Sequence, residues 1–129
     1  MPDMNRILIV EDDERRRSWF DKSFAGCERD TTDDVSVAIQ WLVERDYELI
    51  FLDHDLALEH YDLEMADDGL TGYVVAAWLA AHPESQPDAQ IIIHSLNYTG
   101  SDRMVKCLLD AGRTAEHVPF PYLPSLFSS

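Results

Sequence analysis

The feature that most constrains the fold is an alternation of short, branched apolar runs with longer amphipathic segments. Residues 7–10 and 90–93 are typical of buried strands, and the intervening apolar residues recur with helical spacing. The third helix is expected to bury Leu70, Val74, Trp78 and Ala81. The predicted strands are residues 7–10, 27–31, 47–52, 90–93 and 115–118. The predicted helices are residues 14–25, a segment capped by Thr32 or Asp33, residues 69–81, and a segment that Ser101 or Asp102 opens and Gly112 closes.

Continuous apolar strands that alternate with helices predict a parallel sheet covered on both faces. Right-handed crossovers and short connections favour a three-layer, doubly wound α/β fold of the flavodoxin-like type, with five parallel strands in the order 2-1-3-4-5. We expect residues 1–129 to form one domain. The tail, residues 119–129, holds Pro119, Pro121 and Pro124, so the last helix should be short or missing.

Charge narrows the classes of partner. The chain has 25 acidic and 10 basic residues, a formal net charge of −15, and its lysines are Lys22 and Lys106. Bulk DNA and anionic membranes are bound through clustered Lys and Arg, so neither is an expected partner. No apolar run approaches the ~20 residues of a membrane-spanning helix. The absence of a secretory leader, with Cys27 and Cys107 expected as free thiols, predicts a cytoplasmic protein.

Polar clusters follow the first, third and fourth predicted strands. These strands are neighbours in the order 2-1-3-4-5, and ligands bind beyond the carboxyl ends of such strands. Two like charges about 4 Å apart repel by about 1 kcal/mol in water and by about 4 kcal/mol at a dielectric constant of 20. Several acids together therefore need raised pKa values or a bound cation, and we expect Mg²⁺ or Mn²⁺, held by Glu11 or Asp12 and by Asp53. The clusters are Glu11-Asp12-Asp13, Asp53-His54-Asp55, and His94, Ser95 and Asn97.

Catalytic and structural interpretations compete for these residues. Asp12 or Asp13 could cap the first helix, and a histidine at a strand end often bonds a backbone carbonyl. His54 and His94 each stand beside a pocket acid or hydroxyl, which favours proton transfer near neutral pH. Ser95 and Asn97 would orient ligand oxygens, and His60 could approach the site. A structural interpretation is favoured for the remaining candidates: Arg15–Arg17 form a solvated face or pair with acids rather than bind phosphate, Trp19, Trp41 and Trp78 belong to the core, and His82 and His117 are surface or fold residues.

The segment Ile-Leu-Ile-Val-Glu-Asp-Asp-Glu at 7–14, followed by Leu52-Asp53, resembles the response-regulator receiver domain, the phosphoacceptor module of two-component signalling. The resemblance covers nearly the whole chain and implies a CheY-like fold. It also implies Mg²⁺ held by Glu11 and Asp12, or by Asp12 and Asp13, with a backbone ligand from Asp55. Asp53 would become the phosphoaspartate, and the Ser95 hydroxyl would contact the phosphoryl group.

Two further segments, Phe-Leu-Asp-His-Asp-Leu at 51–56 and Ile-His-Ser-Leu-Asn at 93–97, look like an atypical branch, the cyclic-phosphate-processing receiver domains. This resemblance implies a hydrolytic pocket in which His54 and His94 join the metal site. The chain departs from ordinary receivers after the fifth strand, where Val118 or Phe120 stands in place of the phosphoryl-binding lysine. The segment after the third strand also carries extra acids, and the short tail replaces the usual last helix.

Three functions remain open from the sequence. The first is a metal-dependent cyclic phosphoesterase that acts on a phosphate-ester small molecule or a short nucleic-acid end, with Asp53, His54, His94 and Ser95 as catalytic residues. The second is a receiver phosphorylated on Asp53 by a histidine kinase. The third is a pseudo-receiver that only binds proteins. A homodimer contact is expected unless the tail covers the apolar sheet surface with Tyr122, Leu123, Leu126 and Phe127.

Overall fold

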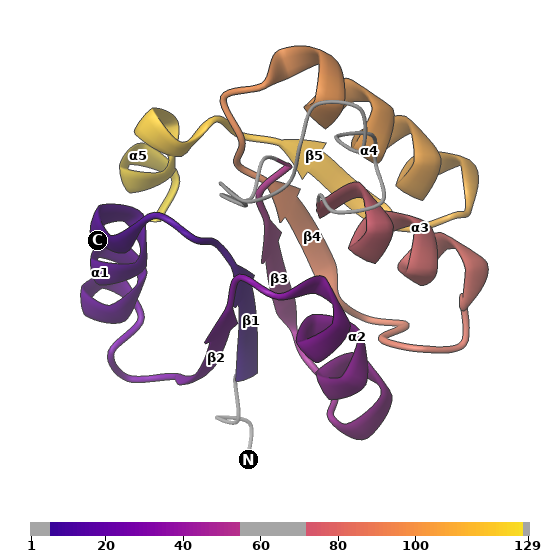
Figure 1. The fold of residues 1–129 in the computed structure, drawn as a ribbon, viewed down its shortest axis with the longest axis horizontal. Coiled ribbons are helices and arrows are strands. Elements are labelled where there is room, and N and C mark those ends of the chain that lie inside the picture. The colour runs from indigo at the N-terminus through magenta and orange to yellow at the C-terminus, as the bar shows by residue number, and fades with distance from the viewer. Residues whose placement is uncertain (1–5, 55–71, 128–129) are drawn as a thin grey trace.

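The computed structural model describes residues 6–54 and 72–127 and shows strands and helices in strict alternation (Figure 1). The side chain of Phe127 lies outside the described part. The strands are β1 (Arg6–Val10), β2 (Glu28–Thr32), β3 (Leu49–Leu52), β4 (Gln90–Ile93) and β5 (Thr114–His117). The helices are α1 (Glu14–Ser23), α2 (Val35–Glu44), α3 (Gly72–Ala81), α4 (Tyr98–Asp110), the 3-10 turn η3 (Phe120–Tyr122) and α5 (Leu123–Phe127).

The five strands form one parallel sheet in the order β2-β1-β3-β4-β5, which confirms the predicted topology. The register aligns the last residues of the central strands, because Val10 lies beside Leu52 and Leu52 lies beside Ile93. The residues that follow are consequently level with one another at the carboxyl edge of the sheet. Backbone hydrogen bonds extend the ladder by one step, from Asp53 N to Val10 O at 3.1 Å and from His94 N to Leu52 O at 3.0 Å.

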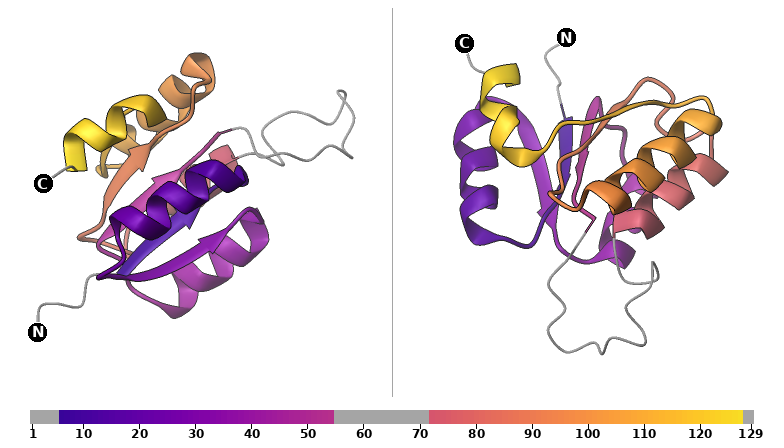
Figure 2. Two further views of the ribbon diagram at one scale, coloured as in Figure 1. Left: turned by 90° about the vertical axis from the view of Figure 1, so that its left-hand side faces the viewer. Right: turned by 90° about the horizontal axis from the view of Figure 1, so that it is seen from above.

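Helices cover both faces of the sheet, as the views in Figure 2 show. α1 and α5 lie on one face, where Phe20, Phe51 and Leu123 belong to a buried cluster with apolar residues of β1 and β4. α2, α3 and α4 lie on the other face over a larger core. The chain therefore has the three layers expected from its strand pattern, and its last helix is short rather than missing.

The starts of two helices differ from the prediction. α2 is capped by Asp34, whose Oδ1 accepts hydrogen bonds from the backbone of Ser36 and Val37, and Thr32 instead accepts from Asp34 N. α4 begins three residues earlier than predicted, because the Asn97 side chain accepts from Gly100 N at 2.8 Å and caps the helix. Each cap is decided by which neighbouring side chain reaches the free N–H groups, which spacing alone does not determine.

The predicted buried stripe of α3 was wrong. The structure buries Gly72, Val75, Ala76 and Leu79, whereas Ala81 is exposed and Trp78 is half-buried. The helix Gly-Tyr-Val-Val-Ala-Ala-Trp-Leu-Ala-Ala is apolar on nearly every side, so its sequence does not favour one stripe over another. Packing against α2 and α4 makes that choice. The predicted start at Gly69, with Leu70 and the preceding loop, falls outside the described residues.

Strand ends differ by one or two residues from their predicted bounds at β1, β2, β3 and β5. Tyr47 illustrates the cause, because its N–H donates to the Gln86 side chain at 2.7 Å and so anchors a turn rather than the ladder of β3. In the tail, Leu123 is fully buried, while Tyr122 and Leu126 are exposed. One of the residues expected to cover the sheet therefore does so.

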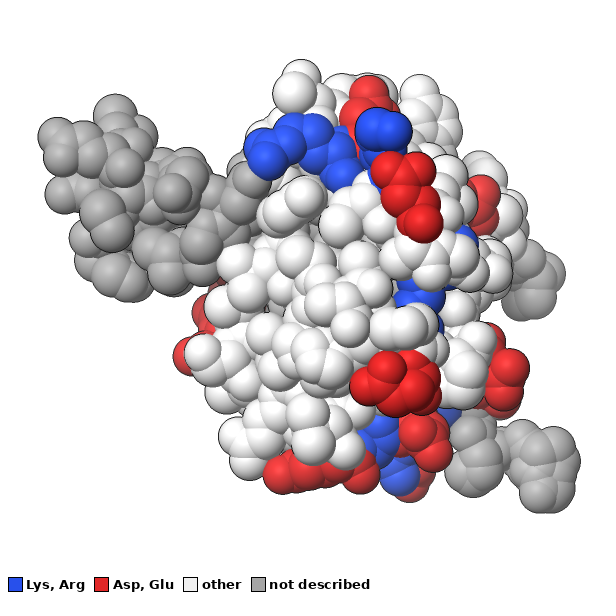
Figure 3. All heavy atoms as spheres, turned by 90° about the vertical axis from the view of Figure 1, so that its right-hand side faces the viewer, with Lys and Arg blue, Asp and Glu red and all other residues white. Residues whose placement is uncertain are grey.

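The face that carries α3 and α4 has no large basic patch among the described residues (Figure 3), as expected from the 10 basic residues of the chain. On the face that carries α3 and α4, Lys and Arg side chains form small groups separated by uncharged surface and by acids (Figure 3). Among residues 6–54 and 72–127, the longest helix has 13 residues and none is suited to crossing a bilayer.

Candidate active site

Three buried polar side chains meet at the carboxyl ends of β1, β3 and β4. Glu11, Asp53 and His94 are 0%, 3% and 0% exposed, and each offers one ligand atom such that all of these atoms lie within 4.8 Å of one another. Each of the three directly follows the last residue of its strand, so the aligned register of the sheet brings them together. The predicted convergence of the three polar clusters is thus present in the structure.

Glu11 organises the turn between β1 and α1. Its Oε1 lies 2.6 Å from His94 Nε2, and its Oε2 accepts a hydrogen bond from Asp13 N at 2.9 Å. Asp13 in turn caps α1 by accepting from Arg16 N at 3.0 Å. Glu11 therefore joins the pocket floor to the helix start, and of the two candidates for the helix cap the structure selects Asp13.

Burial shifts the pKa values of this cluster toward the neutral forms. Desolvation, followed by repulsion from Glu11, raises the pKa of Asp53 to about 7. Desolvation also raises the pKa of Glu11 to about 7, against the opposing hydrogen bond from the Asp13 backbone. His94 has its pKa lowered to about 4 because it is buried, with Phe20, Phe51 and Phe120 around its ring. The imidazole is accordingly neutral at pH 7, while both carboxyl groups exchange protons near that pH.

Ser95 and Asn97 lie beside the cluster in different roles. The Ser95 hydroxyl makes a side-chain hydrogen bond with Asp53 and accepts one from Asn97 N at 2.9 Å. The Asn97 carbonyl oxygen caps α4, and its amide nitrogen lies 3.4 Å from His54 Nδ1. Ser95 is thus placed at the pocket, whereas Asn97, which was expected to orient ligand oxygens, caps α4 and is not among the described lining residues.

His54 is directed away from this cluster. It directly follows Asp53, and successive side chains along a strand point to opposite faces. Its ring packs against Gly100 of α4 so closely that a Cβ there would lie 2.6 Å from His54 Cδ2. Neither histidine is among the described residues that line the pocket, but His94 lies beneath it, with Nε2 2.6 Å from Glu11 Oε1. The structure therefore brings one of the two predicted catalytic histidines, His94, to the acids and places the other against α4.

The pocket above the cluster has a volume of about 210 Å³. Asp12 lines it, as do Asp53 and Ser95, so these predicted site residues share one cavity. Asp55, predicted as a metal ligand, and His60 lie outside the described residues. The full set of described lining residues is Glu11, Asp12, Asp13, Arg16, Asp53, Ser95 and Leu96.

Arg16 is a site residue, although the sequence favoured a structural role for it over phosphate binding. Its Nη1 lies 3.8 Å from Glu11 Oε1 and 3.7 Å from Asp53 Oδ2, and its side chain is 23% exposed. The interpretation of Arg15–Arg17 as partners of neighbouring acids holds for Arg16, but those acids are the ones in the pocket. A signal was present in the sequence, because a residue in the first turn of a helix that follows a strand lies at the ligand-binding edge of the sheet.

His82 and His117 have fold roles, as predicted. His82 Nδ1 lies 2.8 Å from Trp78 O, and the two rings stack. His117 Nε2 lies 2.8 Å from the carbonyl oxygen of Ser95 and so supports the strand end that carries this hydroxyl.

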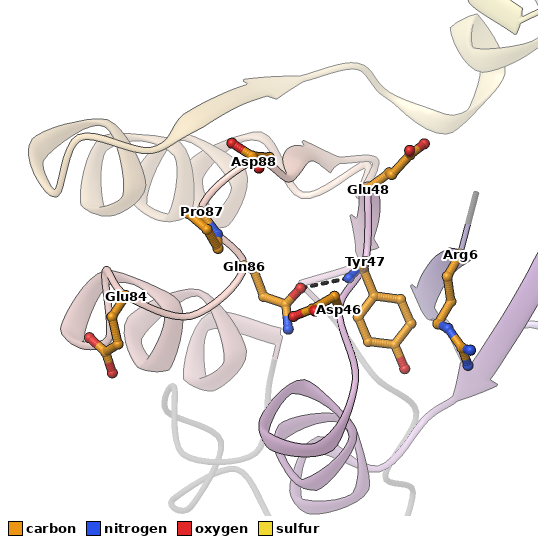
Figure 4. Close-up of a pocket in the computed structure, with 8 residues that line it drawn as sticks. All are labelled: Arg6, Asp46, Tyr47, Glu48, Glu84, Gln86, Pro87 and Asp88. Carbon is orange, nitrogen blue, oxygen red and sulfur yellow. Dashed lines mark hydrogen bonds between the residues drawn. The ribbon is translucent and has the colours of Figure 1, made fainter. Parts of the chain in front are cut away.

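A larger hollow, of about 730 Å³, lies at the opposite edge of the sheet, and Asp46, Glu48, Glu84 and Asp88 are among the residues around it (Figure 4). Gln86 is its most constrained residue, with a φ of 55°. The Gln86 side chain accepts from Tyr47 N and donates to the carbonyl oxygens of Leu42 and Arg45. These bonds join the turns before β3 and β4. The residues around this hollow therefore have a structural role in the fold.

The donor set of the cluster fits a divalent metal ion. Carboxylate oxygens are ligands of Mg²⁺ and Mn²⁺, and an imidazole nitrogen suits Mn²⁺ and other transition metals better than Mg²⁺. Glu11 and Asp53 supply the oxygens and His94 the nitrogen. The donor set of the described residues therefore fits the expected divalent cation.

Comparison with known proteins identifies the family of the chain. A family model described as "Cyclic-phosphate processing Receiver domain" matches residues 7–110. No curated protein matches the chain.

Solved structures of response regulators share the fold. A two-component response regulator from Clostridium difficile is 20% identical with a TM-score of 0.66, over 97% of this chain and 91% of that one. The response regulator TrrA from Thermotoga maritima, solved with Mg²⁺ and BeF, is 23% identical with a TM-score of 0.63, over 90% and 86% of the two chains. Response regulator Rcp1, solved in a Mn²⁺-bound form, is 14% identical with a TM-score of 0.66, over 97% and 96%.

Proposed function

Because the chain belongs to the cyclic-phosphate processing receiver domain family, we propose that its acidic pocket binds a divalent metal ion and hydrolyses a cyclic phosphate ester. The observation that carries this proposal is the convergence of Glu11, Asp53 and His94, whose ligand atoms lie within 4.8 Å of one another. In this proposal residues 1–129 act as one receiver domain. Asp12 and Asp55 stay predicted metal ligands beside Glu11 and Asp53.

The metal ion, when bound, would activate water and neutralise charge on the phosphate oxygens. Glu11 and Asp53 would hold it through carboxylate oxygens, and His94 would hold it through Nε2 or stay bonded to Glu11. The Ser95 hydroxyl would keep the Asp53 carboxylate oriented. Burial is the main cause of the raised pKa of Asp53, and a bound cation would offset the repulsion from Glu11 that adds to it.

Proton transfer would use the bonded pair of Glu11 and His94. In hydrolysis, a water oxygen forms a bond to phosphorus, one ring P–O bond breaks, and the product is a phosphomonoester with a free hydroxyl. One proton must leave the water and one must reach the departing oxygen. With both carboxylates holding the ion, the neutral imidazole of His94, 2.6 Å from Glu11, would be the group of this pair that passes these protons.

The charge of the chain favours a small or short substrate. A net charge of −15 repels a long polyanion, whereas a nucleoside cyclic phosphate or the terminal 2′,3′-cyclic phosphate of a short oligonucleotide brings few charges to the pocket. A volume of about 210 Å³ is consistent with entry of the phosphate and part of the sugar.

Turnover of a short RNA that ends in a 2′,3′-cyclic phosphate, with Mn²⁺ or Mg²⁺, tests the proposal. We expect ring opening to a phosphomonoester, followed by ³¹P NMR, and a loss of rate in Glu11→Gln and His94→Gln. Asp33→Asn, which removes an exposed acid, is the matched control. Absence of turnover in the wild-type protein, or full activity in both pocket variants, would refute hydrolysis at this site.

A second function, phosphoryl transfer to Asp53, is favoured by the hydrogen bond between Ser95 and Asp53 at the end of β3. A small phosphodonor with Mg²⁺ should then add one phosphoryl group to the chain, detectable by mass spectrometry and absent in Asp53→Asn. A histidine kinase would be the partner in that case. If the protein shows neither turnover nor an adduct, and binds no Mn²⁺, the result would favour a protein-binding module.

A further inference from the structure

Arg16 is the one cationic residue among the described residues that line the pocket. Its guanidinium approaches both buried carboxyl groups, at 3.8 Å from Glu11 Oε1 and 3.7 Å from Asp53 Oδ2. These distances are those of ion pairs rather than hydrogen bonds, which have N···O distances of about 2.7–3.2 Å. Within residues 6–54 and 72–127, Arg16 therefore contributes charge to the acids at ion-pair distance, and its N–H groups can turn to a ligand.

Phe120 holds the guanidinium in place. The guanidinium carbon lies 5.3 Å from the centroid of the Phe120 ring, within the range of a cation–π contact. Phe120 is itself fixed to the site, because its N–H donates to the His94 carbonyl oxygen at 2.9 Å. The backbone of Arg16 is also fixed, through the Asp13 cap. The arginine is thus supported from two elements without using its own side-chain donors.

The contact between Arg16 and Phe120 lies where the lysine of ordinary receivers is replaced in this chain. Val118 or Phe120 stands after β5 where ordinary receivers are expected to carry a phosphoryl-binding lysine. The structure shows Phe120 supporting a cation that comes from α1 instead. A guanidinium carries a fork of N–H donors that matches the oxygens of a phosphate group, which a lysine ammonium matches only as a point charge.

We propose that Arg16 is the phosphate-binding residue of this pocket and that its guanidinium donates hydrogen bonds to the non-bridging oxygens of a bound phosphate ester. The identity of the ester rests on the proposed function, whereas the binding of a phosphate group does not. In the absence of phosphate, the same charge lies close to both carboxylates and opposes binding of a second cation. Arg16 should therefore strengthen phosphate binding and weaken metal binding.

Two titrations of the full chain test these opposite effects. Mn²⁺ is titrated alone and followed by electron paramagnetic resonance, and inorganic phosphate is titrated into the Mg²⁺-saturated protein by calorimetry. Arg16→Gln should weaken phosphate binding about 10- to 100-fold, the range for a lost charge-assisted hydrogen bond. It should tighten Mn²⁺ binding several-fold. Arg15→Gln removes the same charge from an exposed neighbour and should change either affinity less than about twofold.

A second variant tests the aromatic support. Phe120→Leu keeps the charge of Arg16 and removes the ring, so phosphate binding should weaken about 2- to 5-fold. Equal phosphate affinities in Arg16→Gln and Arg15→Gln, or no phosphate binding by the wild-type protein, would overturn the inference. Weaker binding of both Mn²⁺ and phosphate in Arg16→Gln would also overturn it, because it would assign Arg16 a structural role.

These outcomes are separable from those of the proposed function. Arg16-dependent phosphate binding without ring opening would refute the hydrolysis and leave the phosphate site intact. Ring opening that proceeds at the wild-type rate in Arg16→Gln would refute the phosphate role and leave the hydrolysis intact.

Discussion

Replacing Asp53 by asparagine should stabilise the metal-free protein, and the gain should grow with pH. Burial and the neighbouring Glu11 raise the pKa of Asp53 from 3.8 to about 7. The unfolded chain therefore releases this proton at a lower pH than the folded protein does. Stability from the protonated carboxyl is present below pH 3.8 and is lost as the pH rises through 7.

The size of the effect follows from the shift. About 3 pKa units at 1.36 kcal/mol each give about 4 kcal/mol for ionising Asp53 inside the fold, all of it expressed above pH 7. At pH 5 the same linkage gives about 2 kcal/mol. Asparagine has nearly the same shape and can keep a hydrogen bond with Ser95, but it carries no charge at any pH. Asp53→Asn should therefore gain about 2–3 kcal/mol more at pH 8 than at pH 5.

Urea unfolding in EDTA, followed by tryptophan fluorescence between pH 4.5 and 8.5, measures this difference. Asp33→Asn is the control, because Asp33 is exposed and its substitution removes the same formal charge. Addition of Mn²⁺ should reverse the order at pH 8, since the wild-type site then gains a ligand that the variant binds poorly. A gain in Asp53→Asn that is the same at pH 5 and pH 8, or a loss at pH 8, would refute the burial argument.

Three further outcomes are expected. Mn²⁺ affinity should fall by up to about 100-fold per pH unit below pH 7, because both buried carboxyl groups must release their protons to bind the ion. Calorimetry at several pH values measures this affinity, and an affinity that does not change with pH would contradict the prediction. Gly100→Ala should lose about 1–3 kcal/mol of unfolding free energy, because its Cβ would meet the His54 ring at 2.6 Å, whereas Gly26→Ala meets nothing within 4 Å and should be neutral in the same denaturation assay. Arg113→Lys should lose about 2–4 kcal/mol of unfolding free energy. The guanidinium donates hydrogen bonds to four backbone carbonyl groups at the end of α3 and in the turn after it, and one ammonium group cannot bond all four. An unchanged thermal midpoint would contradict this prediction.

The fold and part of the site were predictable from the sequence for one reason. Apolar strands have to be buried on both faces, and a parallel sheet with right-handed crossovers permits few arrangements. Glu11, Asp53 and His94 each directly follow such a strand, so their shared edge follows from the topology once the strands are assigned. The caps of α2 and α4 and the buried stripe of α3 were missed, because several neighbouring residues could have served equally well in isolation.

Side-chain direction was the part that the sequence left open. His54 and His94 have the same kind of context in the sequence, yet the first packs on Gly100 and the second on Glu11. Arg16 was one of three consecutive arginines, and in the pocket its guanidinium lies over the ring of Phe120, which is 104 residues further along the chain.

The sequence by itself determined the layers, the strand order and the edge where acids and imidazoles gather, because these depend on hydrophobic periodicity along the chain. Only the tertiary structure decided which imidazole meets the carboxyl groups, which arginine balances their charge, and which polar atoms are already engaged as helix caps. Those choices depend on packing between segments distant in sequence, where a shift of a single ångström separates a hydrogen bond from an ion pair.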